Sequence, residues 1–183
     1  PQWQQEPDVL IMDNDPSRKH SLWLCPSFPH FGRLQNIIER CALDYGTPIF
    51  SPHVTLLDGV YGTGLADTAA ALAKASAPLQ ITLLDAAAGT SYFQCVYLIA
   101  HKGSNLLALN ARARDHFDVR DAPPYMPHLS LVYGDLPREE RTDLALSLSN
   151  SDITFSVDSL ILYETEGLPA RWREIGRYAF NGR

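Results

Sequence analysis

The sequence predicts an α+β fold with mainly antiparallel sheets, built from two related halves. Strand-like and helix-like segments occur in groups along the 183 residues, which is typical of this class. One eight-residue pattern also occurs twice, and such a repeat indicates repeated structure. With 45% hydrophobic residues, the chain can form its core without disulfides or structural metals.

The first half begins with a polar stretch and continues with elements that end at proline or glycine. We expect residues 1–19 to form an N-terminal extension and residues 20–183 a single two-lobed domain. Pro26, Gly46 and Pro78 mark the ends of three elements. The pattern predicts strands at 20–25, 53–60 and 79–84, and helices at 31–45 and 65–77.

The second half shows the same mixture of patterns. A turn at Gly89 is expected to link two strands in a hairpin, and Pro137 suits the first turn of a helix. The predicted strands are 92–100, 128–133, a region near 153–163, and 172–180, and the predicted helices are 105–117 and 137–149.

Charge, hydropathy and cysteine content restrict the class of partner. The net charge is -6 and the 15 basic residues are scattered, whereas a track for long nucleic acid needs a basic stripe. The sequence has no run of about 20 apolar residues for a membrane span, and its three cysteines form no C-x-x-C pair. We therefore expect an intracellular, cytoplasmic protein with a small substrate, which binds neither a membrane nor long nucleic acid. We also expect it to be a monomer.

Two octets carry the candidate chemistry. Phe50-Ser-Pro-His-Val-Thr-Leu-Leu57 and Tyr125-Met-Pro-His-Leu-Ser-Leu-Val132 both read aromatic, any residue, Pro, His, aliphatic, hydroxyl, Leu, aliphatic. Each is predicted to be a strand, because aliphatic and β-branched residues follow a proline that fits a strand start. A lone histidine is more often structural, but repetition of the whole pattern favours a functional role.

The histidine and the hydroxyl residue of each octet lie two positions apart. Because side chains alternate along a strand, His53 and Thr55 share one face, and so do His128 and Ser130. Two positions span about 6.5 Å. Both side chains can therefore reach different atoms of one phosphate.

Two histidines and two hydroxyls are sufficient to open a cyclic phosphodiester. One imidazole takes a proton from the attacking water and the other protonates the leaving oxygen, which is feasible near neutral pH because the ordinary pKa of histidine is about 6.5. The hydroxyls donate hydrogen bonds to the non-bridging oxygens. The sequence has no H-x-H, H-E-x-x-H or Cys/His cluster, so we expect neither a metal nor another cofactor.

The segments His-Val-Thr-Leu at 53–56 and His-Leu-Ser-Leu at 128–131 resemble the H-x-[T/S]-x motifs of the two-histidine (2H) phosphoesterase superfamily. Within it, the chain is most similar to the cyclic phosphodiesterases of plants and fungi, from residue 20 onward and most distinctively over 89–98 and 124–133. The resemblance implies a bilobal fold in which antiparallel sheets flank a central cleft and helices lie outside.

The resemblance also implies substrates and site residues. Family members hydrolyse ADP-ribose 1'',2''-cyclic phosphate, a by-product of tRNA splicing, to the 1''-phosphate, and open nucleoside 2',3'-cyclic phosphates to 2'-phosphates. By position, the catalytic pair is His53 and His128, and the phosphate ligands are Thr55 and Ser130. Tyr133 is a further polar contact, which reaches the cleft only if its strand twists or ends near Gly134.

Two aromatic residues are candidates for contact with the base or ribose of a substrate. Trp23 and Tyr92 can stack on a base or ribose, although either can equally pack in the core or a loop.

Two other functions compete with a cyclic phosphodiesterase. An RNA-end phosphodiesterase or ligase-like enzyme of the same superfamily would need a more basic surface. A non-catalytic nucleotide-binding module would not need both histidines. The sequence thus predicts a metal-independent hydrolase, and the resemblance implies the 2',3'-cyclic-nucleotide 3'-phosphodiesterase type. Which histidine is acid and which is base stays open.

Overall fold

The structure is a computed structural model, and it describes residues 15–149 and 153–182. The strands are β1 (His20–Leu24), β2 (Val54–Val60), β3 (Leu79–Ala88), β4 (Val96–Ala100), β5 (His128–Val132), β6 (Ile153–Val157), β7 (Ser159–Glu164) and β8 (Arg173–Ala179). The helices are α1 (His30–Tyr45), α2 (Leu65–Lys74), α3 (Ser104–His116) and α4 (Arg138–Leu148), with short 3₁₀ turns η1 (Tyr92–Gln94) and η2 (Pro169–Arg171).

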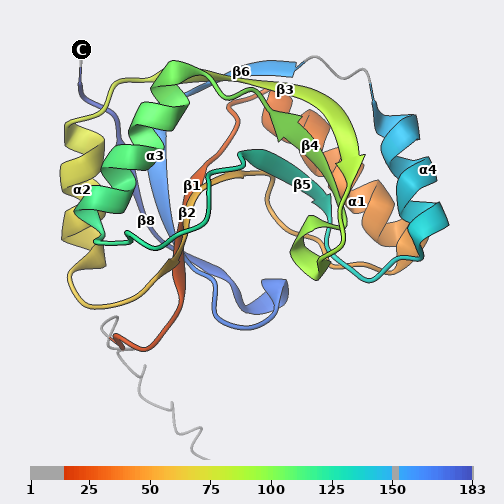
Figure 1. Cartoon of the computed structure of the whole chain (residues 1–183), viewed down its shortest axis with the longest axis horizontal. Coiled ribbons are helices and arrows are strands. Elements are labelled where there is room, and N and C mark those ends of the chain that lie inside the picture. Colours follow the sequence, from red (N-terminus) through yellow and green to blue (C-terminus); the bar gives the residue numbers. More distant parts are fainter. Residues whose placement is uncertain (1–14, 150–152, 183) are drawn as a thin grey trace, which may run out of the picture.

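The two motif strands, β2 and β5, join the halves of one antiparallel sheet, whose order is β6-β3-β4-β5-β2-β1-β7-β8. They are antiparallel neighbours through the pair Val54 and Leu129. Helices α2 and α3 pack mainly on the half that contains β2, and α1 and α4 pack on the half that contains β5. Figure 1 shows these two helix pairs on opposite sides of the molecule. The predicted α+β fold, with two halves, antiparallel strands and outer helices, is confirmed.

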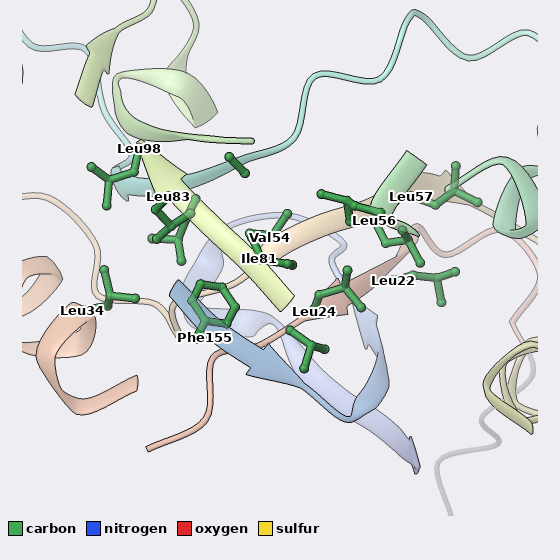
Figure 2. Close-up of a cluster of buried hydrophobic side chains, with 14 of the residues drawn as sticks. Leu22, Leu24, Leu34, Val54, Leu56, Leu57, Ile81, Leu83, Leu98 and Phe155 are labelled. Carbon is green, nitrogen blue, oxygen red and sulfur yellow. The ribbon is translucent and has the colours of Figure 1, made fainter. Parts of the chain in front are cut away.

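Burial of the central motif residues fixes the orientation of their neighbours. Val54 and Leu129 are fully buried, and Figure 2 shows Val54 within a cluster of apolar side chains from several strands. Burying one such side chain contributes roughly 1.5–3 kcal/mol. Because a slip of one residue would exchange the two faces of a strand, this burial turns the histidines and hydroxyls of both motifs away from the core.

Most predicted elements occur close to their predicted ends, with two differences. The region predicted as one strand over 92–100 begins with the turn η1, because a hydrogen bond from the Gly89 amide to the Cys95 carbonyl (3.0 Å) closes a loop there. The region near 153–163 is divided between β6, which pairs with β3, and β7, which pairs with β1 and β8. One extended stretch therefore serves both halves of the sheet.

The last residues of the predicted N-terminal extension are attached to the domain. Arg18 pairs with Glu164, and Nζ of Lys19 lies 2.7 Å from Oδ2 of Asp58. The part of the extension over 1–14 lies outside the described residues. In the part of the chain that the structure describes, no helix is both long and apolar enough to cross a membrane.

Candidate active site

A cavity of about 470 Å³ opens at the junction of the two motif strands. This size falls within the range of small-molecule sites. All the residues that the motifs predict for catalysis and phosphate contact line it: His53, Thr55, His128, Ser130 and Tyr133. Two segments that are far apart in the sequence thus contribute to one site.

The register of the two strands explains this convergence. Because Val54 pairs with Leu129 in antiparallel orientation, His53 lies across from Ser130, and Thr55 lies across from His128. Residues across from each other have Cβ atoms about 4.5–5.5 Å apart, and positions two apart along a strand are separated by about 6.5 Å. The four side chains therefore occupy the corners of a rectangle, with the histidines on one diagonal and the hydroxyls on the other.

Each histidine is held by a contact of the same kind, between its Nδ1 atom and the backbone carbonyl oxygen two residues earlier. Nδ1 of His53 lies 2.7 Å from the carbonyl oxygen of Ser51, and Nδ1 of His128 lies 2.8 Å from that of Met126. A carbonyl oxygen only accepts hydrogen bonds, so these contacts assign the proton of each neutral ring to Nδ1. Nε2 is then the nitrogen that can exchange a proton in each ring.

The surroundings of the two imidazoles differ. His53 is only 4% exposed. Its pKa is lowered to about 4, mainly by burial and to a smaller extent by the nearby His128, while the hydrogen bond to Ser51 acts in the opposite direction. Burial also lowers the pKa of the half-buried His128, against the effect of its bond to Met126. Both rings are therefore mainly neutral in the free protein at pH 7.

The two motif hydroxyls are not in the same state. The Ser130 hydroxyl donates a hydrogen bond to the carbonyl oxygen of Phe93 at 3.0 Å. The Thr55 hydroxyl, by contrast, makes no side-chain hydrogen bond to the residues that the structure describes. Thr55 can thus donate to a ligand directly, whereas Ser130 must first turn away from Phe93.

Tyr133 reaches the cavity because β5 ends at Val132. This end of the strand near Gly134 is one of the two conditions under which the sequence predicted that Tyr133 would reach the cleft. Its ring stacks on Phe50 with centroids 3.8 Å apart, and burial raises its pKa, so the phenol keeps its proton. The Tyr125 hydroxyl donates to the carbonyl oxygen of Thr55 at 3.0 Å. The aromatic position of each octet therefore contacts the opposite octet or the residue directly after it, which gives a structural reason for its repetition.

Neither aromatic candidate for base stacking presents a free ring face to the cavity. Trp23 lines it but is 2% exposed, with His53 on one ring face and Tyr163 on the other. Tyr92 does not line the cavity and packs against the core and against Phe93.

Sequence reasoning missed other residues of the cavity wall. Phe93 and Trp172 line it, with ring centroids 5.8 Å apart, and Gln94, Lys19 and Asp58 add polar groups. Phe93 and Gln94 lie within the distinctive stretch 89–98, which was the available signal for them. Within 15–149 and 153–182, no three His, Cys, Asp or Glu side chains are grouped so that they could hold a metal ion.

Comparison with known proteins agrees with this geometry. Residues 19–167 match the sequence profile of the family described as cyclic phosphodiesterase-like protein. The chain belongs to this family. It is 28% identical over 156 residues to the cyclic phosphodiesterase of Arabidopsis thaliana, a match that covers 80% of this chain and 85% of that protein. The predicted enzyme class of this cyclic phosphodiesterase-like protein, a hydrolase acting on cyclic phosphodiesters, is confirmed.

Solved structures share the fold of this cyclic phosphodiesterase-like protein. TT0787 of Thermus thermophilus superposes with a TM-score of 0.66 at 15% identity, covering 90% of this chain and 99% of that one. E. coli LigT complexed with 3'-AMP gives a TM-score of 0.62 at 15% identity, covering 89% and 98%. Together with the family match, these similarities confirm the predicted membership of the two-histidine phosphoesterase superfamily.

Proposed function

We propose that this protein hydrolyses a small cyclic phosphodiester to a phosphomonoester without a metal ion, and that His53 and His128 are its acid and base pair. The observation that carries the proposal is the placement of both motif histidines and both motif hydroxyls around one cavity, at a strand junction that fixes their spacing. The backbone contacts at Nδ1 of both rings support it, because they leave each Nε2 able to exchange protons.

The proposed reaction is one displacement at phosphorus. The oxygen of a water molecule forms a bond to phosphorus while the bond from phosphorus to one ring oxygen breaks. Nε2 of one histidine accepts the proton of the water, and protonated Nε2 of the other donates a proton to the leaving oxygen. The negative charge of the bound phosphate favours protonation of one imidazole and so opposes the effect of burial on its pKa.

The hydroxyl groups stabilise the charge that develops on the phosphate. Thr55 and Tyr133 donate to its non-bridging oxygens, and Ser130 does so after its hydroxyl has left the Phe93 carbonyl. Removing one such donor from an enzyme typically costs about a hundredfold in rate or more.

The proposed substrates are ADP-ribose 1'',2''-cyclic phosphate and nucleoside 2',3'-cyclic phosphates, which links the protein to the by-products of tRNA splicing. The family likeness supports this choice. The related fold of E. coli LigT has been solved in complexes with ATP, 3'-AMP and NADP+. Phe93 and Trp172 supply aromatic faces on which a base can stack.

The test measures phosphomonoester release from both substrates in the presence of EDTA, for wild type, His53→Ala and His128→Ala. His116→Ala changes an exposed histidine on α3 and serves as the control. We expect activity that survives chelation, falls by about a hundredfold or more in each motif variant, and is unchanged in the control. Undiminished turnover in either motif variant would exclude the proposed pair, and loss of wild-type activity with EDTA would exclude the metal-free reaction.

A further inference from the structure

Gln94 lies beside the nitrogen of His128 that the proposed reaction uses. Its side-chain Nε2 is 3.4 Å from Nε2 of His128, and the residue lines the cavity. Because Nδ1 of His128 donates to the Met126 carbonyl, Nε2 of the neutral ring presents a lone pair to the Gln94 amide. The contact is therefore a long hydrogen bond from the amide to the imidazole.

The backbone around Gln94 is held in place by the second motif and by the loop itself. Gln94 is the last residue of η1, and the contacts that hold η1 are Ser130 Oγ to the Phe93 carbonyl (3.0 Å), the Gly134 amide to the Tyr92 carbonyl (2.9 Å) and the Gly89 amide to the Cys95 carbonyl (3.0 Å). The segment that contains His128 thus also determines where the Gln94 amide lies.

A primary amide suits a histidine that changes its protonation state. Neutral His128 presents a lone pair at Nε2 and needs a donor, whereas protonated His128 presents an N–H there and needs an acceptor. The Gln94 side chain carries an NH₂ donor and a carbonyl acceptor, and a half-turn of the amide exchanges them. A carboxylate would favour the protonated ring alone, and an apolar side chain would serve neither state.

We propose that Gln94 is a positioning residue that holds Nε2 of His128 in both protonation states. The catalytic part of this inference rests on the proposed function, but the contact itself does not. In the described part of the chain, the Nε2 of His53 has no corresponding side-chain partner, and Trp23 stacks on its ring instead. The other titratable or charged side chains around His128 are those of the cavity and of β4: His53, Lys19, Asp58, Tyr133 and Tyr97.

The first experiment is an NMR titration of the His128 imidazole in the free protein. In Gln94→Glu, a carboxylate lies beside the ring, and we expect the pKa of His128 to rise by about one unit or more relative to wild type. Gln80→Glu makes the same charge change at an exposed position of β3 and is the matched control, in which the His128 titration stays at its wild-type position. Amide spectra and unfolding midpoints verify that both variants are folded.

The second experiment compares kinetics. Gln94→Met keeps the length of the side chain but removes both polar groups, and we expect kcat to fall about tenfold with little change in KM. Equal His128 titrations in folded Gln94→Glu and Gln80→Glu would overturn the inference, and so would a Gln94→Met enzyme with wild-type kcat. If wild type does not hydrolyse cyclic phosphates but the His128 titration shifts as expected, the proposed function fails and the contact is upheld.

Discussion

The indole of Trp23 lies flat against the imidazole of His53, with ring centroids 3.5 Å apart and ring planes 4° from parallel. Tyr163 covers the opposite face of the indole at 3.8 Å, and Nε1 of Trp23 donates to the Ser21 hydroxyl at 2.9 Å. The indole is therefore fixed in position, and it limits the rotation of the histidine beside it.

The first prediction concerns this stack. Trp23→Leu removes the flat partner of His53, so we expect kcat to fall at least tenfold because small errors in the placement of a proton carrier are costly. The lost packing should also lower the free energy of unfolding by about 3 kcal/mol. Trp23→Phe keeps an aromatic face and should retain more activity. Trp172→Leu removes a cavity tryptophan that meets Trp23 only edge-on, with ring centroids 5.8 Å apart, and it should raise KM more than it lowers kcat. Wild-type kcat in Trp23→Leu would show that the stack does not position His53.

The second prediction concerns stability at acid pH. The pKa of His53 is about 4 in the folded protein and about 6.5 in an unfolded chain. The unfolded chain therefore binds more protons between these values, and the free energy of unfolding falls as the pH decreases through this range. The expected loss from His53 between pH 7 and pH 5 is about 2 kcal/mol.

Urea unfolding at several pH values checks this expectation in wild type and in His53→Gln. The variant lacks the buried imidazole, so its free energy of unfolding should depend less on pH by about that amount. His116→Gln, which changes an exposed histidine, should keep the wild-type dependence. An identical pH dependence in wild type and His53→Gln would contradict the linkage.

The sequence was sufficient to predict how most residues of the candidate site are placed, because the key information is local. Alternation along a strand depends only on spacing, and burial of Val54 and Leu129 then sets which face His53 and His128 occupy. Which strands become neighbours in the sheet depends instead on packing between segments that are far apart in the sequence. The pattern could not indicate that β6 and β7 separate around Asp158 to join opposite halves of the sheet.

The aromatic residues show the same limit. Trp23 and Trp172 both line the cavity, yet Trp23 is covered on both faces by His53 and Tyr163. No local pattern distinguishes a covered indole from one whose face is available to a ligand, because the covering residues come from other segments. Similarly, η1 exposes Phe93 and turns Tyr92 toward the core. These two directions could not be predicted, because the sequence indicated a regular strand there.

The third prediction separates the two motif hydroxyls. Ser130→Ala removes a partly buried hydrogen bond to the Phe93 carbonyl, so we expect the free energy of unfolding to fall by about 1 kcal/mol. Thr55→Val loses no such bond within the described residues and should leave stability nearly unchanged. Both variants should lose about a hundredfold in kcat. Kinetics and urea unfolding together check this, and equal stability losses in the two variants would show that the bond to Phe93 contributes nothing.

The fourth prediction concerns the ion pair at the cavity wall. Lys19 Nζ lies 2.7 Å from Asp58 Oδ2 and both residues line the cavity, so the carboxylate would compete with a phosphate bound there for the ammonium group. Asp58→Asn should strengthen inhibition by inorganic phosphate about fivefold, which corresponds to roughly 1 kcal/mol, and Lys19→Met should weaken it. Asp118→Asn breaks the exposed pair with Arg120 and is the matched control. Inhibition that is the same in all of these variants would exclude Lys19 from phosphate binding.

The fifth prediction tests the loop that presents Phe93 and Gln94. A Cβ atom added at Gly89 would lie 1.9 Å from the backbone oxygen of Gln94, so Gly89→Ala must displace η1. We expect a loss of about 1–3 kcal/mol in the free energy of unfolding and a lower kcat, since the Gln94 amide would no longer meet His128. A Cβ at Gly103 would have its nearest neighbour at 3.7 Å, which is an ordinary contact, and Gly103→Ala should therefore behave as wild type. If Gly89→Ala is as stable and active as Gly103→Ala, the position of η1 does not determine the activity.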